Sequence, residues 1–117
     1  MIKLKHIVNG VVTAEFDLHE GDFSIGRNGD NTLQLEDSVV SGRHCVLAVS
    51  PNEYLPGSWD VELRDLGSTN GSFVNGAREE QKRLRHNDVL RIGSHEFKLI
   101  DDQINDNTQT EYYVPED

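Results

Sequence analysis

The sequence predicts an all-β protein folded as a sandwich of two sheets, and three observations lead to this fold class. Short segments of alternating apolar and polar residues recur along residues 2–100, with turn signals between them. No stretch of ten or more residues carries the apolar period of a helix, and the best candidate, residues 77–85, lacks an apolar stripe. Many short strands separated by frequent turns are typical of a sandwich.

The first half of the chain opens with a predicted hairpin. Residues 2–8 alternate apolar and basic side chains, and residues 11–18 form a plausible return strand. Asn9-Gly10 between them favours a tight turn, because both residue types accept positive φ. After a turn at residues 20–22, further strands are expected at residues 23–25, 33–35 and 44–49, with polar loops at 28–31 and 36–43.

The second half contains a clean alternating strand, a double turn and a closing hairpin. Residues 59–65 alternate after a loop at residues 50–58 that holds two prolines. Asn70-Gly71 and Asn75-Gly76 each predict a reversal of the chain, with a very short strand between them. Residues 83–85 are expected to pair briefly, and a hairpin of residues 88–92 and 95–100 closes the fold. Trp59 and Phe97 are core candidates.

Length and composition favour one domain in a reducing compartment. The chain has 117 residues, of which 35% are hydrophobic, enough for one modest core. No apolar run approaches the length of a membrane helix, and no signal peptide is visible, so no membrane insertion is expected. A single cysteine, Cys45, excludes an internal disulfide and favours a cytoplasmic location.

The formal charge of −10 is unevenly distributed. Residues 101–117 hold six acidic residues and no Lys or Arg, which leaves residues 1–100 at −4. A nucleic-acid-binding protein needs a basic surface, and none is evident, so this class is excluded. We expect a folded domain over residues 1–100 and an acidic, disordered tail or linker over residues 101–117.

The sequence does not favour an enzyme or a metalloprotein. Ser41 and His44 are three residues apart, but no third group that would orient the imidazole is identifiable. His44 and Cys45 are adjacent, so on a strand they face opposite sides. The five histidines are scattered, and one cysteine cannot build a zinc site. No catalysis, cofactor or metal is expected.

Three polar loops instead suggest a site for an anion. One strand ends with Gly26-Arg27, residues 41–44 open another with Ser-Gly-Arg-His, and residues 67–71 read Gly-Ser-Thr-Asn-Gly. If these loops gather at one end of the sandwich, they bring together a guanidinium, several hydroxyls, an amide and free backbone N–H groups. This set suits a phosphate, because a cationic fork supplies charge and neutral donors fix the geometry.

The same segments resemble the forkhead-associated (FHA) family. The motifs, in order and at suitable separations, are Phe-Ser-Ile-Gly-Arg at residues 23–27, Val-Ser-Gly-Arg-His at 40–44, and Asp-Leu-Gly-Ser-Thr-Asn-Gly-Ser-Phe-Val-Asn-Gly at 65–76. The resemblance covers about residues 20–100. It implies an eleven-stranded sandwich of two sheets whose loops at one end bind phosphothreonine in a partner.

The resemblance also implies roles for individual residues. Arg27 would pair with the phosphate, Ser41 would donate its hydroxyl to it, and Thr69 would border the same pocket. Asn70 would hold the backbone of the bound peptide. Gly42 stands where relatives often carry Arg, Asn or Lys, so it offers the phosphate only a backbone N–H.

Other motif residues are implied to support the loops rather than to contact the ligand. They are Gly26, His44, Gly67, Ser68, Gly71, Asn75 and Gly76. His44 would brace the loops from within. Arg43 is expected to point away from the phosphate, because successive strand residues alternate between faces, and to be solvated or bracing.

These inferences predict a non-catalytic module that recognises phosphothreonine in Ser/Thr-kinase signalling. The expected partner is a phosphothreonine-containing protein or peptide, either a Ser/Thr kinase or its substrate. The alternative is a phosphate-independent FHA-type scaffold, such as one of a bacterial secretion system; retention of Arg27, Ser41 and Asn70 favours the reader. Thr108 or Thr110, if phosphorylated, would allow the tail to occupy its own site, the alternative being a plain linker.

Overall fold

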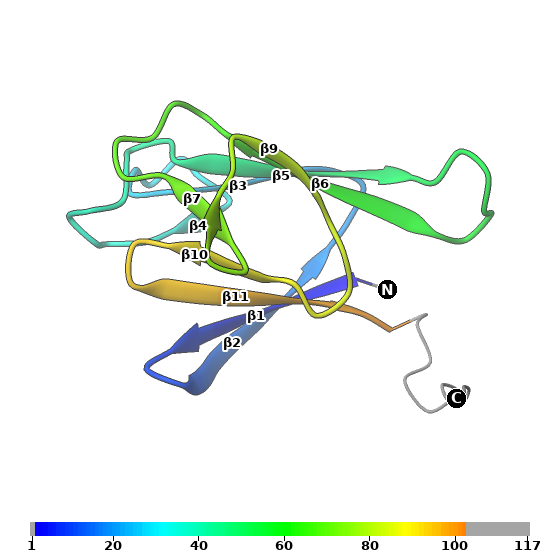
Figure 1. Ribbon diagram of the computed structural model, residues 1–117, viewed down its shortest axis with the longest axis horizontal. Helices are drawn as coiled ribbons and strands as arrows, with labels where there is room; N and C mark the ends of the chain where they lie inside the picture. Colours follow the sequence, from blue (N-terminus) through cyan, green and yellow to red (C-terminus); the bar gives the residue numbers. More distant parts are fainter. Residues whose placement is uncertain (1, 103–117) are drawn as a thin grey trace.

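The computed structural model describes residues 2–102, which form eleven β-strands and, within that range, no helix (Figure 1). The all-β, eleven-stranded prediction is therefore confirmed. The strands are β1 (Ile2–Val8), β2 (Val11–Leu18), β3 (Gly21–Gly26), β4 (Leu33–Gln34), β5 (Cys45–Pro51), β6 (Trp59–Asp65), β7 (Ser72–Val74), β8 (Ala77–Arg78), β9 (Gln81–Leu84), β10 (Val89–Ile92) and β11 (His95–Asp101).

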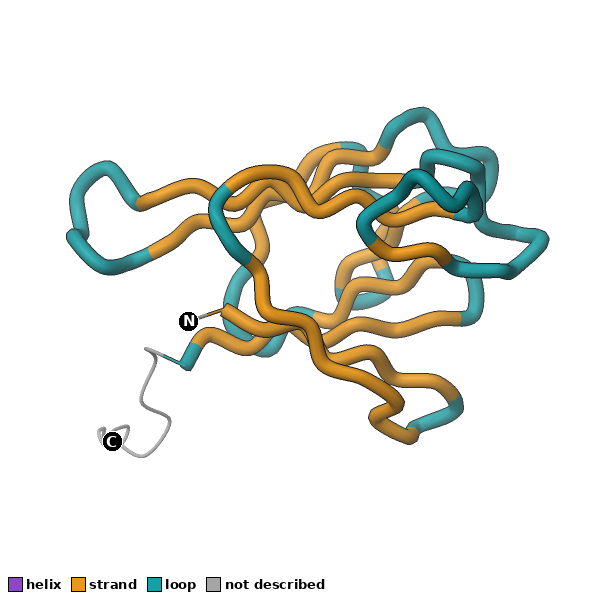
Figure 2. Tube along the Cα trace, turned by 180° about the vertical axis from the view of Figure 1, so that it is seen from behind, coloured by secondary structure: helices purple, strands orange, loops and turns teal. Residues whose placement is uncertain are grey.

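The strands build two sheets that face each other, and Figure 2 shows the two layers with their loops gathered at the ends. One sheet has six strands in the order β2-β1-β11-β10-β7-β8, and the other has five in the order β4-β3-β5-β6-β9. The pairings are antiparallel apart from that of β3 with β4, which is parallel. In the six-stranded sheet, Ile2 at the start of β1 lies opposite Asp101 at the end of β11.

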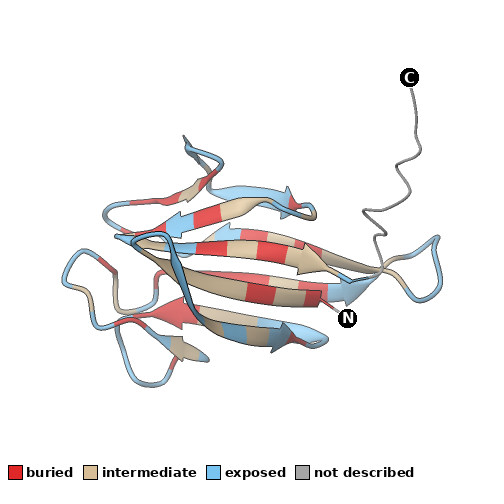
Figure 3. Ribbon diagram, turned by 90° about the horizontal axis from the view of Figure 1, so that it is seen from below, coloured by how far each residue is buried: buried red, intermediate tan, exposed pale blue. Residues whose placement is uncertain are grey.

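The core lies between the sheets and follows the alternation of the strands. Along β6, Val61 and Leu63 are buried while their neighbours are less covered, and Figure 3 shows the buried positions alternating along the central strands. Phe97 is fully buried, as predicted. Trp59 is only partly buried and packs against the buried core residues.

Several boundaries differ from the prediction because long-range pairing extends the strands. β3 begins at Gly21, so part of the expected turn at residues 20–22 belongs to a strand that pairs with β5. β5 runs from Cys45 to Pro51, where it pairs with Trp59, and His44 precedes it. Residues 77–85 contain the short edge strands β8 and β9.

The two Asn-Gly pairs have different places in the fold, and the tight turn predicted at Asn70-Gly71 is wrong. Asn75 and Gly76 have φ of 50° and 88° and form the expected hairpin turn between β7 and β8. In the other pair Gly71 has φ of 90°, but Asn70 is not left-handed. Asn70-Gly71 lies where the chain crosses from β6 in one sheet to β7 in the other, so it is not a hairpin turn.

The connections after β3, β4 and β6 gather at one end of the sandwich, here called the loop end, which lies to the left in Figure 1. It comprises residues 27–32, 35–44 and 66–71. The β5–β6 loop and the end of β11 lie at the opposite end. The predicted tail is outside the described residues from 103 onward, and so are Thr108 and Thr110.

Candidate functional site

The first two loops of the loop end are joined along their backbones. Arg27 donates its N–H to the carbonyl of Ser41 at 2.9 Å, and Asn28 donates to that of Gly42 at 3.1 Å. Gly26 sits beneath this contact, where a Cβ atom would lie 2.3 Å from the Gly42 carbonyl oxygen. Since no real Cβ makes so close an approach, only glycine allows the two loops to lie side by side here.

Asn31 anchors the loop at residues 27–32, and no sequence motif marks it as a site residue. Its side chain is buried, and its amide NH₂ donates to the carbonyls of Asn28 at 2.8 Å and Gly42 at 2.7 Å. The loop therefore has a polar anchor in place of an apolar one. No local pattern reveals this contact, because Gly42 is eleven residues away.

His44 joins the second and third loops to each other and to β3 from inside. Its ring is fully buried, Nδ1 accepts the N–H of Ser41 at 3.1 Å, and Nε2 lies 2.9 Å from the carbonyl of Gly71. Because Nδ1 accepts a hydrogen bond, the proton of the neutral ring is on Nε2, which donates to Gly71. The backbone of His44 also donates to Ile25 and accepts from Leu66.

Asp65 organises the third loop, a supporting role that the sequence motifs did not predict. Its carboxylate accepts the N–H groups of Gly67 (3.1 Å) and Ser68 (2.9 Å) and the hydroxyls of Ser68 (2.6 Å) and Ser72 (2.7 Å). Burial alone would raise the pKa of Asp65, but the hydrogen bonds from Ser68 and Ser72 outweigh it and lower the pKa. The carboxylate is therefore a fixed anionic centre behind the loop.

Ser41, Thr69 and Asn70 lie together where the second and third loops meet. The Ser41 hydroxyl oxygen accepts the N–H of Thr69 at 3.1 Å, so its own proton remains available to another acceptor. The side-chain amide of Asn70 donates to the carbonyl of Val39 at 2.9 Å. Thr69 and Asn70 are exposed, so these groups form an accessible polar surface.

The two arginines of the loop end have different surroundings. Arg27 is exposed, and its guanidinium forms no ion pair or hydrogen bond with any residue between 2 and 102. Arg43 lies 3.3 Å from the carboxylate of Asp30. Arg43 precedes β5, so strand alternation does not set its direction; the loop aims it at Asp30.

The remaining candidate residues divide into two groups. Gly67 and Gly71 donate their N–H groups to Asp65 and Ser68, within the loop end. Asn75 instead exchanges hydrogen bonds with Val89 and donates to Asp88, so the Asn75-Gly76 turn is fixed to the start of β10. The structure does not place that turn in the polar surface.

The thiol of Cys45 is not a nucleophile in this fold. It is fully buried in the core cluster, and burial raises its pKa to about 12. A thiol with that pKa stays protonated near neutral pH, and the thiolate is the reactive form. Separately, among the described residues no helix is long and apolar enough to cross a membrane.

Comparisons with known proteins agree with this geometry. The FHA domain family model matches residues 23–93. The chain is 37% identical over 85 residues to the FHA domain-containing protein FhaA of Mycobacterium tuberculosis, an alignment that covers 70% of this chain and 14% of FhaA. The first curated relatives are matched over 10% to 55% of their own lengths, so this chain spans about half of them or less.

Solved structures give the same result. The FhaA FHA domain in complex with the intracellular domain of Rv3910 is 32% identical, with a TM-score of 0.70, and the match covers 85% of this chain and 99% of that one. A structure from an analysis of phosphothreonine-dependent FHA domain interactions is 31% identical, with a TM-score of 0.70, over 86% of this chain and 95% of that one. This chain therefore belongs to the FHA domain family.

Proposed function

We propose that this chain is a non-catalytic module that binds phosphothreonine in a partner protein. One observation carries the proposal: the exposed guanidinium of Arg27, which has no partner among residues 2–102, lies in a loop whose backbone is bonded to Ser41. A phosphate monoester carries nearly two negative charges at neutral pH, and a free guanidinium can bind it through two parallel hydrogen bonds. The phosphothreonine-dependent interactions described for a similar FHA domain support this assignment.

The other groups then have distinct roles in our proposal. The Ser41 hydroxyl, held by the N–H of Thr69, donates its free proton to a phosphate oxygen. Gly42 offers a backbone N–H, and Thr69 lines the pocket. Asn70 uses its remaining amide hydrogen and carbonyl oxygen on the backbone of the bound peptide, while its contact with Val39 fixes its orientation.

We further propose the setting in which this module acts. The partner is a Ser/Thr kinase or its substrate in the cytoplasm, and residues 1–100 form the binding domain, with residues 101–117 as an acidic extension. The complex of the similar FhaA domain with the intracellular domain of Rv3910 supports a protein partner. Net negative charge on the body makes binding depend strongly on the local cation at Arg27.

The test compares three peptides with identical flanking residues that carry phosphothreonine, phosphoserine or threonine. We expect calorimetry to detect binding to the phosphothreonine peptide, weaker binding to phosphoserine and none to threonine. Arg27→Ala should weaken binding at least about tenfold, since a charge-assisted hydrogen bond contributes about 1.5–3 kcal/mol. Arg43→Ala is the matched control and should change affinity less than about twofold, because an exposed ion pair contributes little.

Two results would contradict the proposal. Equal binding of the phosphorylated and unmodified peptides would show that phosphate is not the ligand. Self-association of the unphosphorylated protein in sizing chromatography, with no phosphopeptide binding, would favour the phosphate-independent scaffold instead.

A further inference from the structure

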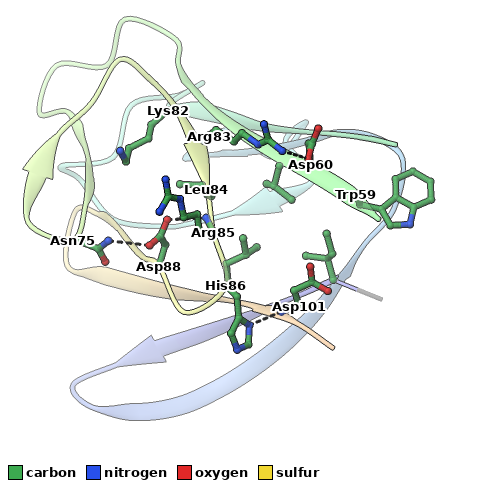
Figure 4. Close-up of a pocket in the computed structure, with 13 residues that line it drawn as sticks. Trp59, Asp60, Asn75, Lys82, Arg83, Leu84, Arg85, His86, Asp88 and Asp101 are labelled. Atoms are coloured by element: carbon green, nitrogen blue, oxygen red, sulfur yellow. Dashed lines mark hydrogen bonds and ion pairs between the residues drawn. The ribbon is translucent and has the colours of Figure 1, made fainter. Parts of the chain in front are cut away.

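A second candidate site lies between the two sheets, away from the loop end. It is a groove of about 850 Å³ between the edge strand β9 of the five-stranded sheet and the ends of β1 and β11 in the other sheet (Figure 4). Apolar side chains of Ile2, Val61, Leu84 and Leu99 line it. Figure 4 shows Trp59 toward one end and Lys82 toward the other.

The groove is lined by three cations, Lys82, Arg83 and Arg85, and by three acids, Asp60, Asp88 and Asp101, but two of the cations have no carboxylate partner among the described residues. Asp60 pairs with Arg83 and accepts from Asn52. Asp88 accepts the backbone N–H of Arg85 at 2.8 Å and the amide of Asn75 at 3.0 Å. Within the part of the chain that the structure describes, the side chains of Lys82 and Arg85 have no carboxylate partner.

The chain itself supplies a segment with complementary chemistry. Asp101 at the end of β11 lines the groove, so residues 103–117 begin at its border. That segment contains Asp106, Glu111, Glu116 and Asp117, no Lys or Arg, and the run Tyr-Tyr-Val at residues 112–114. It therefore offers carboxylates for the free cations and apolar side chains for the apolar lining.

We propose that the groove binds residues 103–117 of the same chain. Acidic residues of the segment pair with Lys82 and Arg85, and residues 112–114 cover the apolar surface beside Trp59. A segment tethered at the rim reaches its site at an effective concentration near the millimolar range, so modest contacts suffice to hold it. The groove is separate from the loop end, so this contact does not require a phosphopeptide and does not compete with one.

Binding of the segment can be measured in the full-length chain. Cys45 is buried with a pKa of about 12, so a Thr110→Cys variant carries one cysteine that a nitroxide reagent can label. We expect the label to broaden the amide signals of residues 82–86 and the indole signal of Trp59, the one tryptophan in the chain. Raising the salt from 0.05 to 0.5 M should reduce the broadening at least about twofold, because salt screens exposed charges.

Charge reversal provides the decisive control. Lys82→Glu combined with Arg85→Glu should remove the local broadening, and both side chains are exposed, so the fold should survive. Arg64→Glu, on another exposed arginine, should leave it unchanged. Uniform broadening, or broadening that persists in the double variant, would overturn the proposal. Broadening of unlabelled ¹⁵N chains mixed with labelled ones would overturn it too, by showing that a second copy is the occupant.

Discussion

The loop end and the groove both present arginines near loops, but the structure holds their polar groups in different ways. At the loop end the groups beneath the surface are buried and bonded: His44 and Ser72 are 0% exposed, and Ser68 is 7% exposed. At the groove the main ion pair lies in solvent, with 65% of the Arg83 side chain and 29% of the Asp60 side chain exposed. The polar groups of the loop end are thus held by buried hydrogen bonds, whereas the ion pair of the groove is exposed.

This difference is consistent with the rigid ligand that we propose for the loop end and with the chain segment that we propose for the groove. A buried hydrogen bond is costly to break, because the partner left behind loses both the bond and water. The accessible groups of Ser41 and Asn70 are thus held in one geometry. Exposed pairs at the groove contribute little and can exchange partners. Four substitutions test this contrast.

The largest effect is expected for His44→Ala. The substitution leaves the N–H of Ser41 and the carbonyl of Gly71 without partners and opens a cavity, so it should lower the free energy of unfolding by about 3 kcal/mol. Urea denaturation measures this change, and phosphopeptide binding should fall with it. His19→Ala, at an exposed position, is the control and should cost under about 0.5 kcal/mol. Equal costs for the two variants would show that the buried bonds do not fix the loops.

The second largest effect is expected for Gly26→Ala, which should lower the free energy of unfolding by about 2 kcal/mol. The added Cβ would collide with the carbonyl of Gly42, and overpacking of this kind costs about 1–3 kcal/mol. Gly29→Ala in the same loop is the matched control: its Cβ would meet nothing closer than 3.8 Å, and its φ is not positive. Thermal unfolding should separate the two variants by several degrees. Similar stabilities would mean that the first two loops separate at little cost.

Asp65→Asn should lower the free energy of unfolding by about 1.5 kcal/mol at pH 7, because the variant loses a charged hydrogen-bond acceptor. The pKa of Asp65 is lowered in the folded protein, so its carboxylate stabilises the fold fully above the ordinary value of 3.8. That contribution is lost as the pH falls through the lowered pKa. The difference in Tm between wild type and variant should therefore shrink from pH 5 to pH 2, and a constant difference would contradict this origin.

The smallest effect is expected at the groove. Arg83→Ala removes an exposed ion pair with Asp60 and should change the free energy of unfolding by less than about 0.5 kcal/mol. A double-mutant cycle with Asp60→Ala gives the coupling of the pair itself. A coupling free energy above about 1.5 kcal/mol would contradict the difference drawn between the buried hydrogen bonds of the loop end and the exposed ion pair of the groove.

Local patterns predicted much of the fold. The bounds of β1, β2, β6 and β7 agree with the alternation and turn signals, because these strands have one buried face and clear boundaries. Order along the chain does not reveal which sheet a strand joins. The sequence therefore predicted a tight reversal of the chain at Asn70-Gly71, whereas the chain crosses there to the other sheet and long-range pairing places β7 beside β10.

The candidate site was predicted only in part, because several of its contacts join residues that are far apart in the sequence. The motifs identified Arg27, Ser41 and Asn70 as site residues, and their binding roles remain predictions. Asn31 and the side-chain contact of Asn70 with Val39 depend on partners 11 and 31 residues away, which no local pattern encodes. The direction of Arg43 also depended on such a partner, since Asp30 and not strand alternation determines it.

The antiparallel pairing of β1 with β11, in which Ile2 lies opposite Asp101, has a mechanical consequence. The two ends of the described chain are neighbours, so a force that pulls them apart acts across the strands rather than along them. The hydrogen bonds between β1 and β11 then break one after another, instead of resisting the force together. Under tension the domain should open first at this seam and at low force, while the loop end on the far side carries no load until the seam has opened.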